Sequence, residues 1–305
     1  MDEVPPTSVL LPTTRWTSAC ADVADQLRPA DELLVICDED TDAIADRSDD
    51  LPGNARLVVA GEPTGCSGKA NAIATGMESA RHDRLVWTDD DFHHPPAWLA
   101  GLHADYERHG PVSELPFFVG RDPLSLLLEP VYALGGTLGA YANDKAWGGA
   151  VMFERDDLDV DAFLAELRRT VSDDGLLSEH LDATPLRRVR RVEIGGTIRE
   201  TLERHVRFTQ IVHRHEPRDT ALMGTVTAAV AAFCLLLPTY AFSVTTLLLA
   251  GIYTMFGVRR WTALLAYPAI LVQLPLMAYA LARRTFVWGG RRYRWRSKFD
   301  VTVVE

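Results

Sequence analysis

The sequence contains few cysteines, and they lack the spacings that cysteine chemistry requires. Only Cys20, Cys37, Cys66 and Cys234 occur among 305 residues, and no two form a CxxC pair. A disulfide framework or a cysteine zinc site depends on such pairs. We therefore predict four reduced, structural thiols. The adjacent histidines at 93–94 and the pair at 213 and 215 are more typical of surface or supporting positions than of zinc ligands.

Glycine-rich nucleotide-binding motifs are also missing. No GxGxxG occurs, and the segment ending in Gly68-Lys69 fails as a phosphate loop because Pro63 stands five residues before Gly68 and Ala70 follows the lysine. Lys69 at a helix start would still attract a phosphate through its charge and the helix dipole. The alternative for Lys69 is a solvated side chain. The acidic N-terminus has no apolar core, which predicts that there is no signal peptide.

Positive charge is scarce in the first part of the chain. Residues 219–305 hold nine Lys/Arg and three acids, a net +6, so the overall −11 leaves −17 on residues 1–218. Nucleic-acid binding requires Lys and Arg against phosphates. We therefore expect no nucleic-acid partner.

Short apolar runs are present in an order that predicts the fold class. Runs at residues 8–12, 33–37, 57–60, 84–87 and 150–153 predict strands, and periodic segments at 17–27, 67–80 and 161–169 predict helices. Continuous apolar strands alternating with helices indicate an α/β fold, with a mainly parallel sheet and helices on both faces.

Carboxylates follow two of these predicted strands. Asp38 begins an acidic turn after the second, and Asp89, Asp90 and Asp91 follow residues 84–87. Three adjacent acids at a buried edge repel one another by several kcal/mol unless a cation lies among them. The triplet therefore favours a divalent metal at the sheet edge; the alternative is a solvated acidic turn.

A second acidic pair begins a later helix. Asp173 and Asp174 follow Ser172, which is a typical helix-capping residue. The pair either complements the helix dipole or supplies a general base that deprotonates a hydroxyl.

Charged residues are absent from two long stretches, 221–258 and 261–282. A bilayer crossing needs about 20 apolar residues. The first stretch is too long for one crossing, and residues 238–240 predict a turn that makes it a hairpin. The arginines at 259–260 and 291–296 both favour the cytoplasmic side, which a hairpin followed by a bent interfacial segment satisfies. The aromatic, basic tail predicts a lipid-headgroup surface or a solvated end.

Six motifs, in this order, carry a resemblance that covers nearly the whole chain: Asp38 to Asp42, Gly68-Lys-Ala-Asn, Asp89-Asp-Asp91, Ser172-Asp-Asp174, Arg204-His-Val-Arg-Phe208 and Trp288-Gly-Gly-Arg-Arg-Tyr293. Together they resemble the inverting family 2 glycosyltransferases, and within them the membrane-attached ceramide-glucosyltransferase-like group. Two departures occur: Phe208 replaces a signature tryptophan, and Asp38-Glu-Asp replaces the usual Asp-Gly-Ser.

The resemblance implies a GT-A fold, with a catalytic domain at residues 1–218 and membrane helices with a basic tail at 219–305. It implies the following roles: Asp174 as the catalytic base that deprotonates the acceptor hydroxyl, with Asp173 as a second catalytic residue beside it; Asp38, Lys69, Asp89, Arg204, Arg207 and Phe208 as substrate-binding residues; Asp91 and Asp89 as ligands of Mg²⁺ or Mn²⁺. Asp90, the variable middle acid, is expected to tolerate asparagine.

The function so implied is metal-dependent transfer of a sugar, with inversion, from a nucleotide-sugar donor to a lipid acceptor. The donor is expected to be a UDP-sugar, and the acceptor a membrane or polyprenyl-type lipid. The protein is expected in the cell membrane as a multi-pass protein, with the catalytic domain on the cytoplasmic side. A membrane-bound nucleotidyltransferase and a transport or binding protein remain the alternatives, although apolar stretches without charges argue against ion transport.

Overall fold

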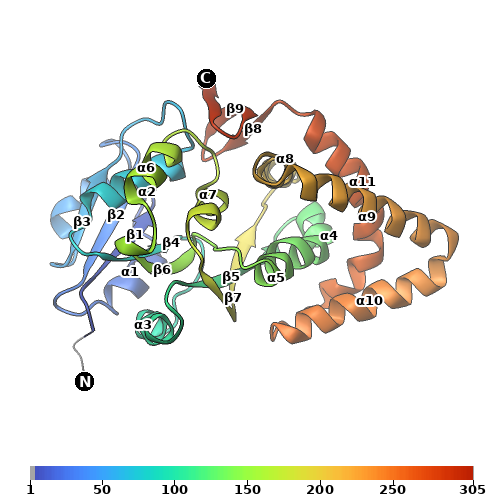
Figure 1. Ribbon diagram of the computed structural model, residues 1–305, viewed down its shortest axis with the longest axis horizontal. Helices are drawn as coiled ribbons and strands as arrows, with labels where there is room; N and C mark the ends of the chain where they lie inside the picture. Colours follow the sequence, from blue (N-terminus) through green and yellow to red (C-terminus); the bar gives the residue numbers. More distant parts are fainter. Residues whose placement is uncertain (1–3, 305) are drawn as a thin grey trace. The chain divides into compact units, whose positions relative to one another are not determined.

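The computed structural model describes residues 4–304, which belong to two compact units interleaved along the chain (Figure 1). The first unit contains the residues up to Leu115, Asp144–Leu186 and Lys298–Val303; the second contains Pro116–Asn143 and Arg187–Ser297. The functional division after residue 218 stays a prediction.

A seven-stranded sheet with the order β3-β2-β1-β4-β6-β5-β7 organises the first unit and continues into the second. Its strands are β1 (Thr7–Pro12), β2 (Glu32–Cys37), β3 (Ala55–Val59), β4 (Arg84–Thr88), β5 (Val112–Gly120), β6 (Ala150–Glu154) and β7 (Thr184–Ile194). The pairs β1–β2, β2–β3 and β1–β4 are parallel, whereas β6 runs antiparallel to β4 and β5. The predicted strands are thus confirmed.

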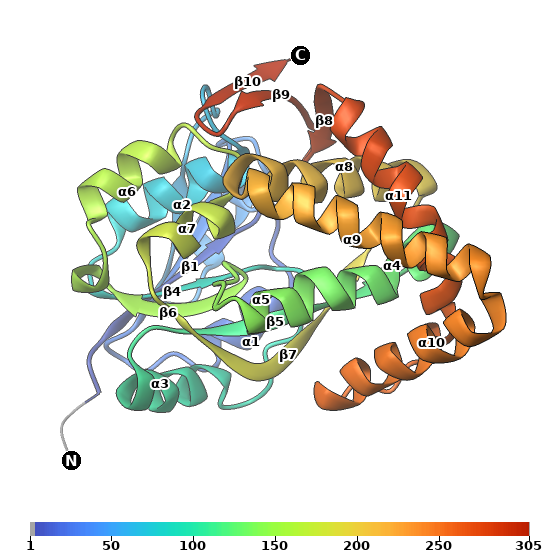
Figure 2. The ribbon, with the colours of Figure 1, turned by 45° about the vertical axis from the view of Figure 1, so that its right-hand side comes forward.

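Helices cover both faces of this sheet in the first unit (Figures 1 and 2). They are α1 (Ser18–Ala24), α2 (Gly68–Ser79), α3 (Trp98–His109), α6 (Val160–Leu167) and α7 (Asp173–His180), with 3₁₀ turns at Ala45–Asp50 and Arg155–Asp157. Side chains alternate along β4: Leu85 and Trp87 belong to the core under α2, α6 and α7, whereas Arg84 reaches His103 of α3 on the other face. The predicted fold class, a mainly parallel α/β sheet with helices on both faces, is confirmed.

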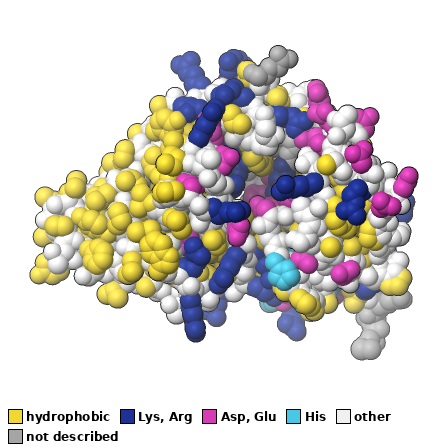
Figure 3. All heavy atoms as spheres, turned by 180° about the vertical axis from the view of Figure 1, so that it is seen from behind, with side chains coloured by type: hydrophobic (Ala, Val, Ile, Leu, Met, Phe, Trp, Pro, Cys, Tyr) yellow, Lys and Arg dark blue, Asp and Glu magenta, His cyan; other side chains and the backbone are white. Residues whose placement is uncertain are grey.

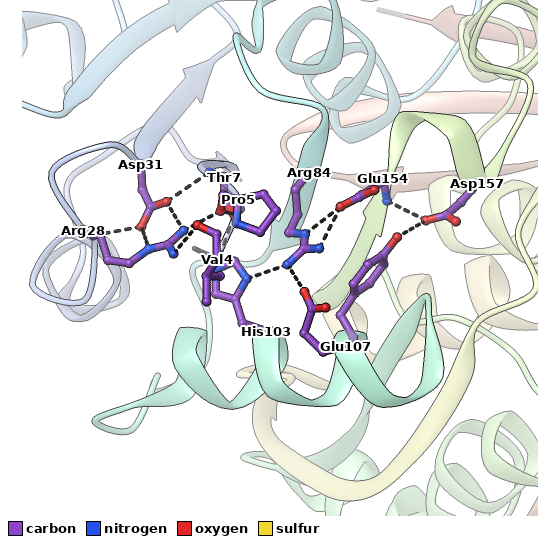
Figure 4. A network of polar contacts seen from close by, with 11 residues as sticks. Val4, Pro5, Thr7, Arg28, Asp31, Arg84, His103, Glu107, Glu154 and Asp157 are labelled. Carbon is purple, nitrogen blue, oxygen red and sulfur yellow. Dashed lines mark hydrogen bonds and ion pairs between the residues drawn. The ribbon is translucent and has the colours of Figure 1, made fainter. Parts of the chain in front are cut away.

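A polar network closes the amino-terminal end of β4 (Figure 4). The Arg84 guanidinium is almost fully buried and binds Glu107 and Glu154, each at 2.8 Å. Arg84 Nη1 also donates to His103 Nδ1 at 3.2 Å. Burial, with the positive charges of Arg28 and Arg84, lowers the pKa of His103 to about 4. The imidazole is therefore neutral and can accept this hydrogen bond.

The second unit is mostly helical. Its elements are α4 (Pro123–Tyr132), a π-helical turn (Ala133–Leu138), α5 (Gly139–Ala142), α8 (Ile198–His215), α9 (Pro217–Leu236), α10 (Pro238–Met255), a 3₁₀ turn (Trp261–Leu265) and α11 (Ala266–Ala282); then come β8 (Thr285–Trp288), β9 (Arg291–Ser297) and β10 (Asp300–Val304). Helix α11 packs against α4, α8, α9 and α10. The break at Leu237 divides the first uncharged stretch, as the hairpin prediction requires.

Two helical segments in the described part are long and apolar enough to cross a membrane, Pro217–Leu236 and Trp261–Ala282. Only 17% and 22% of their apolar windows are buried, which is unlike the core helices of a soluble protein. Large apolar side chains stay exposed on α9 and α10, among them Leu235, Leu236, Tyr240 and Leu247 at 71–78%. They contribute to the continuous apolar surface in Figure 3.

The basic tail forms strands β8, β9 and β10, which were not predicted from the sequence. Tyr293 and Trp295 are 2% and 1% exposed, whereas Arg294 and Arg296 are exposed. This alternation follows the two-residue period of β9. The two aromatic rings therefore lie inside the fold. Of these four side chains, only the two arginines are exposed enough to contact lipid headgroups.

The chain returns to the first unit at its end. Lys298 forms an ion pair with Glu179, and the Phe299 ring packs on the core of that unit with the Arg169 guanidinium 5.4 Å from its centroid. The four cysteines are buried and free in the structure.

Candidate active site

Two helix starts are fastened together in the first unit. Ser67 accepts a hydrogen bond from Ala70 N and caps α2, as the sequence predicts. Its own backbone N–H donates to Thr170 O at 3.1 Å and its hydroxyl donates to Val171 O at 2.8 Å. Since α7 begins just beyond, these bonds hold the first turn of α2 beside the first turn of α7.

Lys69, in that first turn of α2, lies between two of the predicted acids. Its Nζ is 2.7 Å from Asp89 Oδ1 and 3.1 Å from Asp173 Oδ2. Burial disfavours a charged ammonium, but the carboxylates of Asp173, Asp89 and Asp174 outweigh it and raise the pKa of Lys69 well above its usual value. The ammonium therefore stays charged and joins the acids after β4 to those that begin α7.

Asp174 completes this cluster. Its Oδ1 accepts a hydrogen bond from Gly148 N at 3.3 Å. Burial and the neighbouring charge of Asp173 raise the pKa of Asp174 well above its usual value, although Lys69 acts in the opposite direction. A carboxylate with a raised pKa is a stronger base, so this side chain suits proton abstraction from a hydroxyl.

Two glycines leave room for the acids. A Cβ at Gly148 would lie 2.7 Å from Asp174 Oδ1 and 2.8 Å from Asp173 Oδ2, and one at Gly149 would lie 2.8 Å from Asp89 Oδ2. Real Cβ atoms do not approach other atoms so closely. Gly148 and Gly149 were not among the predicted site residues, although the segment Trp147-Gly-Gly149 before a predicted strand was a signal for them.

The side chains of the three acids after β4 lie in three different environments. Asp89 faces Lys69, whereas Asp90 Oδ2 accepts a 2.5 Å hydrogen bond from Thr13, which follows β1. Burial raises the pKa of Asp90, with a smaller contribution from Asp89. Asp91 is exposed. Because β1 and β4 are parallel, their carboxyl ends meet at the sheet edge where ligands bind in open α/β folds.

No group of three His, Cys, Asp or Glu side chains is arranged for a metal among residues 4–304. Carboxylate oxygens at Asp89 and Asp91 nevertheless have the chemistry that Mg²⁺ and Mn²⁺ prefer. Magnesium sites commonly use one or two carboxylates, with substrate phosphates and water filling the remaining positions. The donor set therefore fits a cation that arrives with a diphosphate.

The histidines after the acidic triplet support the loop. His94 is buried and its Nε2 lies 2.6 Å from the Thr88 hydroxyl, while Asp22 Oδ2 accepts from the His94 backbone N–H and lies 2.7 Å from His93 Nδ1. These contacts make them positioning residues, and the structure gives no sign of a zinc site there in the part of the chain it describes.

Asp38 lies at the carboxyl end of β2, beside β1. The backbone N–H groups of Asp38 and Glu39 donate to Asp42 Oδ2 at 2.9 and 3.0 Å, which closes the acidic turn. The Asp38 side chain is partly exposed. This placement leaves it at the same edge of the sheet as the acids after β4.

Arg204, Arg207 and Phe208 lie on α8 of the second unit. The Arg207 guanidinium is 3.9 Å from the centroid of the Trp288 ring and 5.3 Å from that of Phe208. Phe208 also contacts the rings of Phe118 and Tyr132. Trp288 therefore places an indole ring against Arg207, whereas position 208 carries phenylalanine in place of the signature tryptophan.

Residues 17–146 match the model of the glycosyl transferase family 2. The matched segment contains Asp38, Lys69 and Asp89 to Asp91. This part of the chain is therefore similar to glycosyl transferase family 2 domains, which supports the glycosyltransferase activity that the motifs predict. The GT-A type of the fold stays a prediction. Membership of the ceramide-glucosyltransferase-like group stays a prediction.

Solved structures with a similar course of the chain include mannosyl-3-phosphoglycerate synthase from Rubrobacter xylanophilus, at 14% identity and a TM-score of 0.45, covering 70% of this chain and 75% of that one. Glucosyl-3-phosphoglycerate synthase from Mycobacterium tuberculosis, in complex with Mn²⁺, UDP and phosphoglyceric acid, has 19% identity, a TM-score of 0.41, and coverage of 70% and 79%. TarS of S. aureus in complex with UDP-GlcNAc has 11% identity, a TM-score of 0.39, and coverage of 98% and 99%. No curated protein matches the sequence.

Proposed function

We propose that this glycosyltransferase moves a sugar from a UDP-sugar to a hydroxyl of a membrane lipid or polyprenyl-type acceptor, with inversion at the anomeric carbon. One observation carries the proposal. Lys69 Nζ bridges Asp89 and Asp173 at 2.7 and 3.1 Å, and so joins the acids after β4 to those beginning α7. The acids expected to bind the sugar donor, after β4, and the acids expected to activate the acceptor, at the start of α7, therefore form one cluster.

Asp174 is the base in this proposal. Its carboxylate takes the proton of the acceptor hydroxyl while that oxygen attacks the anomeric carbon, and the bond to the nucleoside diphosphate breaks on the opposite face. The raised pKa of Asp174 supports this role, because it strengthens the carboxylate as a base. Asp173 is held by Lys69, and its negative charge beside Asp174 helps to raise the pKa of Asp174.

The remaining residues bind the donor. Asp91 and Asp89 would hold Mg²⁺ or Mn²⁺, which when bound stabilises the charge on the departing diphosphate. Asp38 would contact the nucleotide base from the end of β2. Arg204 and Arg207 would complement phosphate charge, with Phe208 packed beside them.

Apolar features of the second unit support a lipid acceptor. Besides the exposed side chains of α9 and α10, a cavity of about 480 Å³ opens between α4, α8 and α11. Its walls are Leu124, Leu127, Leu202, Val272, Pro275, Leu276 and Tyr279. An alkyl or prenyl chain fits such walls better than a polar acceptor does. We further propose that the protein resides in the cell membrane with its catalytic domain on the cytoplasmic side.

The test is sugar transfer in membranes that contain the protein, supplied with labelled UDP- and GDP-sugars, lipid extract and Mg²⁺ or Mn²⁺. Label in the lipid fraction is expected with UDP-sugars. Asp174→Ala and Asp91→Ala should each abolish it, while Asp90→Asn, the matched control, should retain it. Substantial turnover in either alanine variant would overturn the role of that residue. Nucleotide in the product would indicate a nucleotidyltransferase instead, and no product would favour transport or binding.

A further inference from the structure

Lys69 is fixed beside a carboxylate that the proposed function assigns to a metal ion. Its Nζ lies 2.7 Å from Asp89 Oδ1, and the two side chains are only 16% and 20% exposed. The other oxygen, Asp89 Oδ2, lies beside Gly149, where a Cβ would approach it to 2.8 Å. The backbone N–H of Asp89 also donates to Gly149 O at 3.2 Å. Contacts on both sides therefore hold this carboxylate against the ammonium.

The position of Lys69 follows from the start of α2. Lys69 is the second residue of the helix that Ser67 caps, so the backbone keeps the lysine stem in the first turn. From there its Nζ also reaches Asp173 Oδ2 at 3.1 Å. Asp89 and Asp173 therefore share one positive charge that is covalently part of the chain and cannot dissociate from the site as an ion can.

A divalent ion at Asp89 would lie close to this charge. Mg²⁺ is about 2.1 Å from a carboxylate ligand, so an ion on either oxygen of Asp89 would be within about 7 Å of Lys69 Nζ. This separation is shorter than the Debye length of about 8 Å at physiological ionic strength, so salt screens the repulsion only in part. The site therefore attracts a divalent ion less strongly than the same carboxylates would without the lysine.

A diphosphate changes this balance. Its oxygens carry negative charge, and magnesium sites commonly take further ligands from substrate phosphates. Negative charge placed beside both the ion and the ammonium offsets the repulsion between them. Cation binding and diphosphate binding should therefore strengthen each other, and thermodynamic linkage requires that they do so by the same factor.

We propose that Lys69 makes cation binding at Asp89 depend on the sugar donor. The ammonium disfavours a divalent ion that arrives alone and accepts one that arrives with a nucleoside diphosphate. A site of this kind binds and releases the ion together with the nucleotide. The inference rests on the metal and donor site of the proposed function, and it assigns to Lys69 the control of when that site is filled.

Equilibrium dialysis of the purified protein tests this dependence, with Mn²⁺ and UDP as probes at fixed free concentrations. In the unaltered protein, UDP should tighten Mn²⁺ binding about tenfold or more. Lys69→Met should bind Mn²⁺ alone about tenfold or more tightly than the unaltered protein, and UDP should then add less. Lys69→Arg retains the charge and is the matched control. Adding Asp89→Asn to Lys69→Met should remove the gain, because the ion loses its carboxylate.

Equal Mn²⁺ affinity of Lys69→Met and the unaltered protein without UDP would overturn the inference and leave the proposed function intact. A gain that survives Asp89→Asn would also overturn it, because the ion would then lie elsewhere. An unaltered protein that binds no Mn²⁺ even with UDP would instead overturn the metal site of the proposed function. Thermal unfolding checks that each variant is folded, and Lys69→Gln is a second neutral variant that should match Lys69→Met.

Discussion

Lys69 determines how closely the carboxylates of the site can approach one another. Unit charges 4 Å apart interact by about 4 kcal/mol at an effective dielectric constant of 20. Asp89 and Asp173 both lie within 3.1 Å of the Lys69 ammonium. Its positive charge offsets the repulsion between the two acidic groups, so the cluster can form before any substrate or cation binds.

Replacing this charge should change the pH dependence of the reaction. Because Lys69 lowers the pKa of Asp174 against the stronger effects of burial and Asp173, Lys69→Met should raise that pKa further. The acid limb of the pH–rate profile for kcat should then move to higher pH, with a fall of about tenfold or more at neutral pH. Lys69→Arg retains the charge and is the control. An unmoved acid limb in Lys69→Met would contradict this assignment.

The glycine at position 148 should be intolerant of even one methyl group. In Gly148→Ala the new Cβ displaces Asp173 and Asp174, and a displacement of about 1 Å can lower a rate about 100-fold. Gly101→Ala is the matched control. Its Cβ meets nothing within 4 Å inside α3, so it should stabilise the fold by about 0.5–1 kcal/mol without changing the rate. Equal activity of the two variants would refute the close approach.

At the scale of whole elements, strand β4 has a structural polar network at its start and the candidate active site at its end. Arg84 begins it in a closed polar network, and Asp89 follows it in the site. Between them, Leu85 and Trp87 are fully buried in the core. Strand β4 therefore connects the polar network around Arg84 to the acids of the site.

Removing the guanidinium at the start of β4 should destabilise the first unit. Arg84→Met leaves Glu107 and Glu154 without their partner, and because these two side chains are 55% and 33% exposed, the expected loss is about 1–3 kcal/mol. Denaturant titration of the purified protein measures the loss. Arg81→Met, whose side chain is 70% exposed and 3.7 Å from Glu32, should change stability by less than about 0.5 kcal/mol. A loss in Arg84→Met no larger than in this control would show that the network contributes little.

The junction of α4 and α8 should weaken in acid. Burial alone would raise the pKa of Asp122, but hydrogen bonds from Thr201 and Ser125 hold it below its usual value. The stabilisation is present above the unfolded-state pKa of about 3.9 and is lost as pH falls through the lower folded-state pKa. The difference in Tm between the unaltered protein and Asp122→Asn should therefore be largest near neutral pH and shrink below about pH 4. A pH-independent difference would contradict the linkage.

Elements that depend on neighbouring residues were predictable from the sequence, and those that depend on distant contacts were not. The caps at Ser67 and Ser172, the strand before Asp89 and the break near Pro238 all follow from local patterns. The partnership of Asp90 with Thr13 joins positions 77 residues apart, which no local pattern encodes. Strand β9 was missed because its alternating arginines and aromatics are equally typical of a membrane surface.

At the scale of the whole molecule, charge is divided between the two ends of the chain. Residues 1–218 carry a net −17 and residues 219–305 carry +6. At an anionic lipid surface, residues 219–305 would therefore be attracted and residues 1–218 repelled.

Exposed arginines of β9 should strengthen binding to anionic lipid. The double variant Arg294→Gln/Arg296→Gln should bind phosphatidylserine-containing vesicles about 10- to 30-fold more weakly at low salt, since each arginine contributes about 1 kcal/mol. Flotation measures the bound fraction. The difference should disappear on neutral vesicles and shrink at high salt. Equal binding of both proteins to anionic vesicles would show that β9 does not face lipid.

The return of Phe299 to the first core has a consequence for biosynthesis. The ribosome completes all of α9, α10 and α11 before it adds the aromatic ring that packs on the core of the first unit. A nascent chain stopped before this residue lacks both that ring and the Lys298–Glu179 ion pair. The core of the first unit is therefore finished only in chains that already contain α9, α10 and α11, so its last packing step follows synthesis of the helices of the second unit.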